Sequence, residues 1–284
     1  MTEEIELHCE DGVTLPATIW RAAPANTPRR VVVIAPALGV PRKFYRKFAD
    51  ALAQAGYGVL VFDYRGIDGA GAQVAPRDLQ LAHWGQRDLQ AALHYARTQL
   101  QADKLALVGH SIGGQLPGLA SDAQYIDALV MVAASLPHGS RYGLRDRLQI
   151  ELLWRVFVPL LGRGERFPAR RIGFASIDLP GRIVREWAAW GSRKDYLFDP
   201  RFGLDTRAYA RFKIPLLAYS FEDDGYASKT AVEALNARYS AAQLTHRHLA
   251  RVPGKTFGHF GYFRESQRDS LWRETLDWLD RALR

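Results

Sequence analysis

The amino-acid sequence predicts an α/β fold in which a mostly parallel sheet has helices on both faces. Short apolar runs rich in β-branched residues alternate along the chain with longer segments of helical periodicity, which is typical of a parallel sheet built from βαβ units. A chain of 284 residues, 48% hydrophobic and 24% charged, is also long enough to bury a substantial core. These observations favour one large domain or two small ones.

The chain begins with a predicted hairpin. Two stretches, Ile5–Cys9 and Val13–Trp20, flank a turn that contains Asp-Gly, so we expect an antiparallel pair at one edge of the sheet. The continuous β-branched run Val31–Ile34 predicts a strand buried on both faces. Apolar residues at helical spacing then predict a helix over Phe44–Ala55, which Gly56 would end.

The next part of the chain repeats this alternation of strand and helix. It predicts a strand at Tyr57–Phe62, a glycine-rich loop at Gly66–Ala75, a helix near Trp84–Gln101, and strands at Leu105–Val108 and Ala128–Val132.

The pattern changes over residues 137–212, which are rich in arginine, glycine and aromatic residues and carry no buried-strand signal. Two amphipathic helices are predicted there, near Arg145–Leu161 and Pro180–Trp190. The alternation then returns with a strand at Pro215–Tyr219, a helix near Lys229–Tyr239, a strand at His246–Val252 and a closing helix at Glu265–Leu283. Eight strands are thus predicted, with residues 137–212 inserted after the sixth and residues 1–136 and 213–284 forming the core.

The composition bears on several classes of protein. No run of about 18 apolar residues is present, so no transmembrane segment is expected. The acidic start, Met1–Glu6, lacks the apolar region of a secretory signal. Cys9 is the only cysteine, which excludes an internal disulfide and a cysteine-based metal cluster. We therefore expect a cytoplasmic protein.

Positive charge is concentrated in the insertion. The net charge is +8, and residues 141–211 hold 15 Lys and Arg against 8 Asp and Glu. Such a field attracts acidic substrates or an anionic membrane surface, and an arginine-rich surface with no ligand is the alternative explanation. Nucleic-acid binding is not expected, because no nucleic-acid-binding module is recognisable.

The G-x-S-x-G motif at residues 109–113 carries the most chemical information. It follows the predicted strand Leu105–Val108 and precedes small residues that can open a helix, and in this setting the motif exposes a nucleophilic serine on a sharp turn. Side chains at Gly109 or Gly113 would clash in that turn, and free N–H groups at the start of the helix would favour negative charge near Ser111. Because the bare pattern also occurs by chance, the assignment depends on partner residues.

A nucleophilic serine needs a base, which is usually a histidine oriented by a carboxylate. Three acids, residues 222–224, directly follow the predicted strand Pro215–Tyr219, where functional groups collect in parallel sheets. We favour Asp224 as the orienting acid, with Asp223 as the alternative. If neither acid is catalytic, the three acids form a polar turn that caps a helix.

His259 is the candidate base, because its loop follows the last predicted strand and lies among glycines and aromatic residues. The other histidines fit less well. Predicted strands contain His8, His246 and His248, and a predicted helix contains His94. His83 lies upstream of Ser111, His110 lies beside it but points away, and His138 lies at the start of the insertion.

These residues together resemble the α/β-hydrolase superfamily over nearly the whole chain. The order Ser111, Asp224, His259 is that of the catalytic triad of this superfamily. The resemblance is closest to bacterial α/β-hydrolases related to the serine-aminopeptidase-like and monoacylglycerol-lipase-like branch. The matching motifs are Ala35-Pro36-Ala37-Leu38-Gly39, Phe62-Asp63-Tyr64-Arg65-Gly66, Gly109-His110-Ser111-Ile112-Gly113-Gly114, Glu222-Asp223-Asp224 and Gly258-His259-Phe260.

The resemblance implies an oxyanion hole made by backbone N–H groups. Leu38 would supply one donor, with Ala37 less favoured, and Ile112 the other. Many members carry His-Gly where this chain has Pro36-Ala37, but a backbone donor survives a change of side chain.

The resemblance also implies that residues 137–212 form a helical cap, or lid, over the site. Aromatic side chains of this segment, together with His138, would then shape an apolar pocket, unless they form the cap's own core. They are Trp154, Phe157, Phe167, Phe174, Trp187 and Trp190.

We therefore expect a serine hydrolase that cleaves a carboxylic ester through an acyl-enzyme on Ser111, with no metal and no organic cofactor. Its partner would be a small-molecule acyl substrate, and the basic insertion suggests an anionic or lipid-like one. Thioesterase, amidase, peptidase or acyltransferase chemistry with the same triad is the first alternative, because the fold does not separate these reactions. A non-catalytic ligand-binding protein on the same fold is the alternative from another class.

Overall fold

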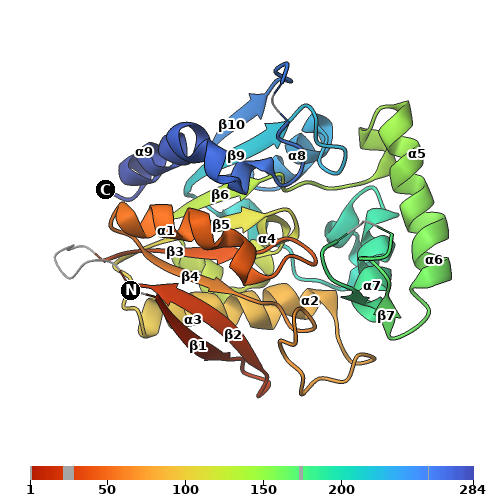
Figure 1. Ribbon diagram of the computed structural model, residues 1–284, viewed down its shortest axis with the longest axis horizontal. Helices are drawn as coiled ribbons and strands as arrows, with labels where there is room; N and C mark the ends of the chain where they lie inside the picture. The colour runs from red at the N-terminus through yellow and green to blue at the C-terminus, as the bar shows by residue number, and fades with distance from the viewer. Residues whose placement is uncertain (1, 22–28, 173–174, 255) are drawn as a thin grey trace.

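The computed structural model describes residues 2–21, 29–172, 175–254 and 256–284. An eight-stranded sheet forms its centre, with the strand order β1-β2-β4-β3-β5-β6-β9-β10 (Figure 1). The β1–β2 and β2–β4 pairs are antiparallel and the other five neighbouring pairs are parallel. The predicted fold class, a mostly parallel eight-stranded sheet with an antiparallel edge, is therefore confirmed.

The strands of this sheet are β1 (Thr2–His8), β2 (Thr14–Trp20), β3 (Arg30–Ala35), β4 (Gly58–Phe62), β5 (Lys104–His110), β6 (Ala128–Val132), β9 (Pro215–Phe221) and β10 (Gln243–Leu249). The α-helices are α1 (Arg46–Gln54), α2 (Leu81–His83), α3 (Gln90–Thr98), α4 (Ile112–Gln115), α5 (Leu144–Leu152), α6 (Val158–Leu161), α7 (Gly181–Gly191), α8 (Lys229–Asn236) and α9 (Arg273–Ala282).

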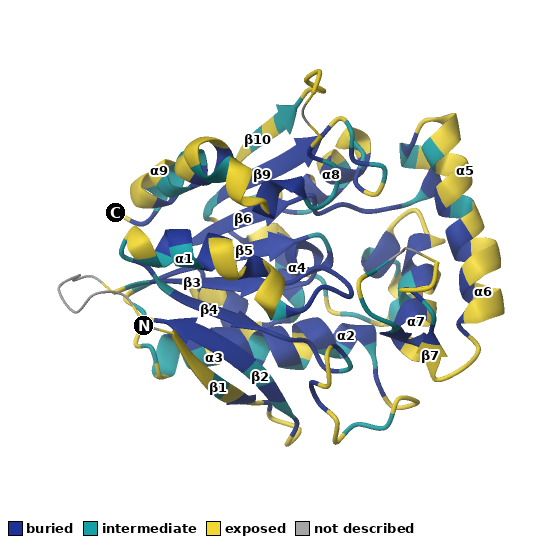
Figure 2. Cartoon of the chain, viewed as in Figure 1, coloured by how far each residue is buried: buried dark blue, intermediate teal, exposed yellow. Residues whose placement is uncertain are grey.

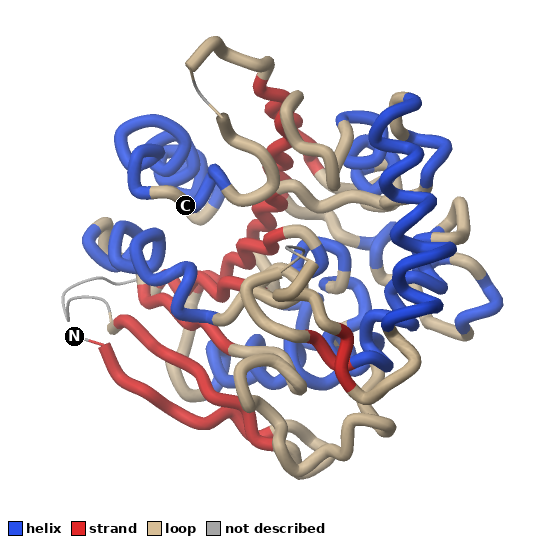
Figure 3. The backbone as a smooth tube through the Cα atoms, turned by 45° about the vertical axis from the view of Figure 1, so that its right-hand side comes forward, coloured by secondary structure: helices blue, strands red, loops and turns tan. Residues whose placement is uncertain are grey.

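The alternation of side chains along the strands creates two cores, one on each face of the sheet. Val31 and Val33 of β3 join the apolar cluster that contains α3, whereas Val32 and Ile34 join the cluster that contains α1 and α9. Figure 3 shows helices on both sides of the strands. Burial on both faces explains why the central parallel strands are continuous apolar runs in the sequence.

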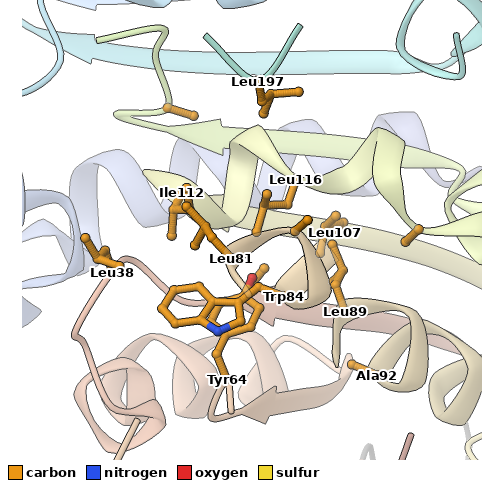
Figure 4. Close-up of a cluster of buried hydrophobic side chains, with 14 of the residues drawn as sticks. Leu38, Tyr64, Leu81, Trp84, Leu89, Ala92, Leu107, Ile112, Leu116 and Leu197 are labelled. Carbon is orange, nitrogen blue, oxygen red and sulfur yellow. The ribbon is translucent and has the colours of Figure 1, made fainter. Parts of the chain in front are cut away.

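Several predicted helices are broken by π-helical turns. The helix expected at Trp84–Gln101 is instead α2, a π-helical turn at Trp84–Leu89, and α3. Trp84 stacks on Tyr64 with the ring centroids 4.5 Å apart, which fixes this turn against the sheet (Figure 4). A π-helical turn at Leu153–Phe157 likewise joins α5 to α6, and another at Arg268–Trp272 precedes α9.

Two strand predictions need correction. The last strand, β10, begins three residues before the expected His246 and ends at Leu249, because the first residues of this edge strand are exposed and mostly polar and so give only a weak apolar signal. The insertion also contains a short antiparallel pair, β7 (Arg166–Phe167) with β8 (Leu179–Pro180). Strands of two residues are too short to show a strand pattern in the sequence.

The segment between β6 and β9 carries α5, α6 and α7, which gather at one end of the molecule, at the right in Figure 1. Hydrogen bonds tie it to the core. Tyr196 Oη donates to Gln115 Oε1 at 2.9 Å and Tyr209 Oη donates to the Gln115 carbonyl at 2.6 Å. Because Gln115 ends α4, these bonds hold the segment against the turn that carries Ser111.

Candidate active site

Ser111 lies on a strained turn between β5 and α4. Its backbone has φ +53° and ψ −117°, a region that costs a non-glycine residue about 1–3 kcal/mol. The Ser111 N–H donates to the Val132 carbonyl at 2.9 Å, and the Ser111 carbonyl accepts from Gly114 N–H at 3.0 Å. The turn is thus held by β6 on one side and by the start of α4 on the other.

The glycines that flank Ser111 are needed because backbone segments approach closely there. A Cβ on Gly109 would lie 2.5 Å from the Gly114 Cα, and a Cβ on Gly113 would overlap the Ala35 carbonyl oxygen. The packing of β5, α4 and the end of β3 therefore leaves no room for a side chain at either position.

The helix after Ser111 is shorter than the sequence suggested. α4 spans only four residues and gives way to a 3₁₀ turn at Pro117–Leu119, because Pro117 has no N–H with which to continue the helical hydrogen bonds. Such a short helix has little macrodipole, so any negative charge near Ser111 would depend on individual N–H groups instead.

Asp224 and His259 are brought together by the loops that follow β9 and β10. His259 Nδ1 lies 2.8 Å from Asp224 Oδ2, and the Asp224 side chain is fully buried. Asp224 Oδ1 accepts from the N–H groups of Tyr226 and Ala227 at 2.8 and 3.1 Å. These donors satisfy the buried carboxylate and fix its direction, so it can orient the imidazole through Nδ1.

Asp223 holds the backbone of the loop that carries His259. Its carboxylate accepts from Phe257 N–H at 2.9 Å and from Gly258 N–H at 3.0 Å. The two neighbouring acids therefore have different contacts, one with the imidazole and one with the backbone just before it. The second contact was not foreseen from the sequence, because backbone acceptors leave no pattern in the residue types.

Ser111 and His259 line the same cavity. Among the described residues there is no direct hydrogen bond between the Ser111 hydroxyl and the His259 imidazole, a contact that often forms only when substrate binds.

Two backbone N–H groups near Ser111 are free to bind an anion. Within the described part of the chain, neither the Leu38 nor the Ile112 N–H has a hydrogen-bond acceptor, and Leu38 lines the cavity. The Ala37 N–H is engaged, because it donates to Tyr45 Oη at 2.8 Å. The geometry therefore favours Leu38 over Ala37 as the donor on this loop.

A buried network links the loop of Leu38 to the loop of His259 through the residue before the nucleophile. Tyr45 Oη lies 2.8 Å from His110 Nδ1, and His110 Nε2 lies 2.9 Å from the His259 carbonyl. A carbonyl can only accept, so Nε2 carries the proton, and the Tyr45 hydroxyl donates to Nδ1. Burial holds the pKa of His110 well below its ordinary value, which keeps the ring neutral and this network intact.

From the sequence, His110 was expected to point away from the nucleophile and to have no catalytic role. The structure agrees on that direction but gives the ring partners on two other loops.

The cavity around Ser111 has an apolar wall contributed by the insertion. Trp154 and Trp187 pack edge to face with their centroids 4.4 Å apart, and Trp154 Nε1 donates to the Pro137 carbonyl at 3.2 Å. The full lining is Ala37, Leu38, Ser111, Gln115, Ser135, Pro137, Ile150, Trp154, Trp187, Tyr226, His259 and Phe260.

Other pocket candidates lie elsewhere, so the predicted pocket needs correction. Trp190 is buried inside the insertion, 5.6 Å from the Tyr196 ring, because it faces inward from α7. His138 does not line the cavity, because its ring turns back to accept from the Ser140 N–H. Phe167 is buried within the insertion, and Phe157 is half exposed on its outer side. Phe174 lies outside the described residues.

Gln115, Ile150 and Tyr226 also line the cavity and were not predicted from the sequence. Gln115 Nε2 donates to the Ser135 carbonyl at 2.7 Å, and Gln115 Oε1 accepts from the Tyr196 hydroxyl. Both ends of the amide are therefore held by hydrogen bonds. Only Gln115, in the segment directly after the motif, gave a positional hint.

The residues that the structure describes contain neither a metal-binding group nor a membrane-spanning helix. No group of three or more His, Cys, Asp or Glu there is placed to hold a metal ion. No helix there is both long and apolar enough to cross a membrane.

Known proteins resemble the chain in sequence and in fold. A family model described as the alpha/beta hydrolase family matches residues 32–269. A carboxymethylenebutenolidase of Pseudomonas putida is 31% identical over 143 residues, which cover 46% of this chain and 60% of that protein. The chain thus spans less than two thirds of the length of this curated relative.

Solved structures share the fold at low identity. The structure of DcsB with its substrate analogue has a TM-score of 0.68 and 17% identity, and the match covers 100% of this chain and 99% of that one. Est1E from Butyrivibrio proteoclasticus with bound ferulic acid has a TM-score of 0.65 and 17% identity over 98% of both chains. The family match covers most of the chain, and together with the strained Ser111 turn it leads to one conclusion: the chain belongs to the alpha/beta hydrolase family.

Proposed function

We propose that this protein is a serine hydrolase that cleaves carboxylic esters through an acyl-enzyme on Ser111. The observation that carries the proposal is the convergence on one cavity of a serine in a strained turn, a histidine bonded to a buried carboxylate, and Leu38, whose N–H has no acceptor among the described residues. These are the groups that acyl transfer requires: a nucleophile, an oriented base and donors for an oxyanion.

In the first half of the reaction, His259 Nε2 takes the Ser111 hydroxyl proton while Oγ attacks the ester carbonyl. His259 Nδ1–H donates to Asp224, which leaves the Nε2 lone pair free and stabilises the imidazolium. The carbonyl oxygen becomes an oxyanion that the Leu38 and Ile112 N–H groups bind. As the intermediate collapses, the carbon–oxygen bond to the alcohol breaks and His259 Nε2–H protonates the departing oxygen.

The second half repeats these steps with water. His259 removes a proton from a water molecule, whose oxygen attacks the acyl carbon. Breaking the bond to Oγ then returns the proton to Ser111 and releases the carboxylic acid. Each proton is accounted for by Ser111, His259 and water, so the proposal needs no metal or cofactor.

Similar proteins support ester chemistry. The Pseudomonas relative is named for a butenolide, which is a cyclic ester, and several solved structures of the same fold are named esterases. The apolar wall of Trp154 and Ile150 suits an apolar acyl or alkyl group. In this proposal residues 137–212 act as a cap that shapes the pocket. Kinship with the monoacylglycerol-lipase-like branch is part of the proposal.

The test is Ser111→Ala assayed on a p-nitrophenyl ester, with circular dichroism to establish that the variant folds. Turnover should fall to the background rate, and a fluorophosphonate probe should label the wild-type protein but not the variant. Full esterase activity in the variant would refute the proposal. A folded wild-type protein that never labels would favour the ligand-binding alternative, and a panel of esters, thioesters and aminoacyl amides would distinguish the other acyl-transfer reactions.

A further inference from the structure

The outer face of the α5–α6 segment exposes a row of apolar side chains, which we call the outer stripe. Its members recur at every fourth position, and they are Leu144, Leu148, Leu152, Val156 and Leu160. Leu144 is 87% exposed, Leu148 62% and Leu160 59%. Figure 2 shows the outer sides of α5 and α6 as mostly exposed. A soluble protein rarely exposes so many large apolar residues together unless they contact something.

The stripe is continuous along the segment because of the helix geometry. Steps of four residues drift by about 40° around an α-helix, since each residue turns by about 100°. The wider π-helical turn at Leu153–Phe157 reduces that drift midway, so the later members stay near the line of the earlier ones. The opposite side of the same segment is also apolar, because Ile150, Trp154 and Val158 are buried against the rest of the protein.

Arginines are frequent within and directly after the segment that carries the stripe. Residues 144–171 hold seven arginines against three acids, Asp146, Glu151 and Glu165. Arg155 pairs with Glu151 at 2.5 Å. Within the described part of the chain, the remaining six make no ion pair, and they are Arg145, Arg147, Arg163, Arg166, Arg170 and Arg171. Apolar side chains flanked by unpaired cations are the combination that binds an anionic interface.

The stripe adjoins a groove that shares its wall with the catalytic cavity. The groove is lined by residues of α5 and of the π-helical turn, including the half-exposed Phe157, and by Ile172. Ile150 and Tyr226 line both this groove and the cavity that contains Ser111. An occupant of the outer face would therefore sit beside the wall of the candidate active site.

We propose that the outer face of α5–α6 binds an anionic lipid surface, with the stripe in the acyl boundary and the arginines at the headgroups. A second copy of the chain fits less well, because a symmetric pair of these faces would bring two sets of unpaired arginines together. The proposal concerns binding and does not depend on the ester chemistry, since it rests on residues outside the triad.

The experiment is flotation of the full chain with vesicles of equal parts phosphatidylcholine and phosphatidylglycerol, beside vesicles of phosphatidylcholine alone. The protein should bind the anionic vesicles more tightly, and added salt should weaken that binding. Leu148→Ser, Leu152→Ser and Leu160→Ser combined should lower the partition coefficient about tenfold or more. Leu244→Ser, at a leucine that is 46% exposed on β10, is the matched control and should bind as wild type.

Three outcomes would overturn the proposal: no binding to anionic vesicles at low salt, equal binding by the triple variant, or equal binding to both kinds of vesicle. A concentration-dependent dimer that the triple variant abolishes, without vesicle binding, would assign the face to a second copy instead. Repeating the flotation with Ser111→Ala separates lipid binding from catalysis, because loss of turnover should leave the partition coefficient unchanged.

Discussion

Removing the Tyr45 hydroxyl tests whether the network through His110 positions the catalytic loops. Tyr45 is fully buried, and its oxygen accepts from Ala37 N–H and donates to His110 Nδ1, each at 2.8 Å. Tyr45→Phe would leave both partners buried and unsatisfied. Each unsatisfied group costs about 1–3 kcal/mol, so the free energy of unfolding should fall by roughly 2–6 kcal/mol in total.

The same substitution should lower kcat. The Ala37 N–H is the anchor of the loop whose next residue, Leu38, is the proposed oxyanion donor. Complete loss of one such donor costs about 100- to 1000-fold in kcat. Because Tyr45→Phe loosens the Leu38 donor without removing it, we expect a fall of about 10- to 100-fold with little change in KM.

Denaturant unfolding and steady-state esterase kinetics measure the two effects separately. Tyr57→Phe is the matched control. The Tyr57 hydroxyl donates to Asp280 at 2.6 Å, at the amino end of β4 and away from the cavity. This variant should lose stability and keep its kcat. If Tyr45→Phe loses stability and its folded fraction also keeps the wild-type kcat, the network has only a structural role and our reasoning is wrong.

Three further comparisons test the site. Asp224→Asn should lower kcat about 10⁴-fold, because the carboxylate that orients His259 is lost. Asp223→Asn should lower kcat far less, because Asp223 only stabilises the loop that carries His259. A larger fall in kcat for Asp223→Asn than for Asp224→Asn would exchange the roles of the two acids. His110 has a folded-state pKa well below its unfolded value, so the unfolded chain binds an extra proton below about pH 6.5 and stability is lost as the pH falls. Relative to His110→Gln, wild type should lose up to about 1.4 kcal/mol per pH unit from pH 6.5 to 5, and equal slopes in denaturant titrations would contradict this. Gly113→Ala should cost about 3 kcal/mol or more, because its Cβ would overlap the Ala35 carbonyl, whereas Gly225→Ala, with open space around it, should unfold near the wild-type temperature.

The parts of the site that the sequence predicted are those set by strand ends. Ser111 and Asp224 follow apolar runs, His259 follows the last predicted strand, and parallel strands bring their carboxyl ends to one edge of the sheet. The fold was predictable for a related reason, since strands buried on both faces stand out as continuous apolar runs. The edge strand β10 did not, and its predicted start was three residues late.

The rest of the site depends on where side chains point, which residue types do not specify. Neighbours such as Asp223 and Asp224 look alike in the sequence, yet one binds the backbone and the other the imidazole. Trp190 and Trp187 are both aromatic residues of α7, but the helix turns one into the insertion and the other toward the cavity. The outer stripe was likewise not predicted from the sequence. The segment was predicted as one amphipathic helix, and that pattern did not show that its apolar residues lie on two opposite sides.

The contacts of residues 137–212 bear on whether that segment works as a detachable lid. Tyr142 Oη donates to the Tyr226 carbonyl at 2.6 Å, beside the loop of Asp224, and Tyr196 and Tyr209 hold Gln115 beside Ser111. Leu179 fills the space next to Gly39, one residue after the proposed oxyanion donor.

The insertion thus contacts all three loops that carry the proposed chemistry. Removing it would expose these contacts and disturb Ser111, Asp224 and Leu38 together, so loss of activity after deletion would say nothing about substrate choice. Specificity is better probed by single changes at Ile150 and Trp154, which face the cavity from the insertion while the contacts with the loops remain in place.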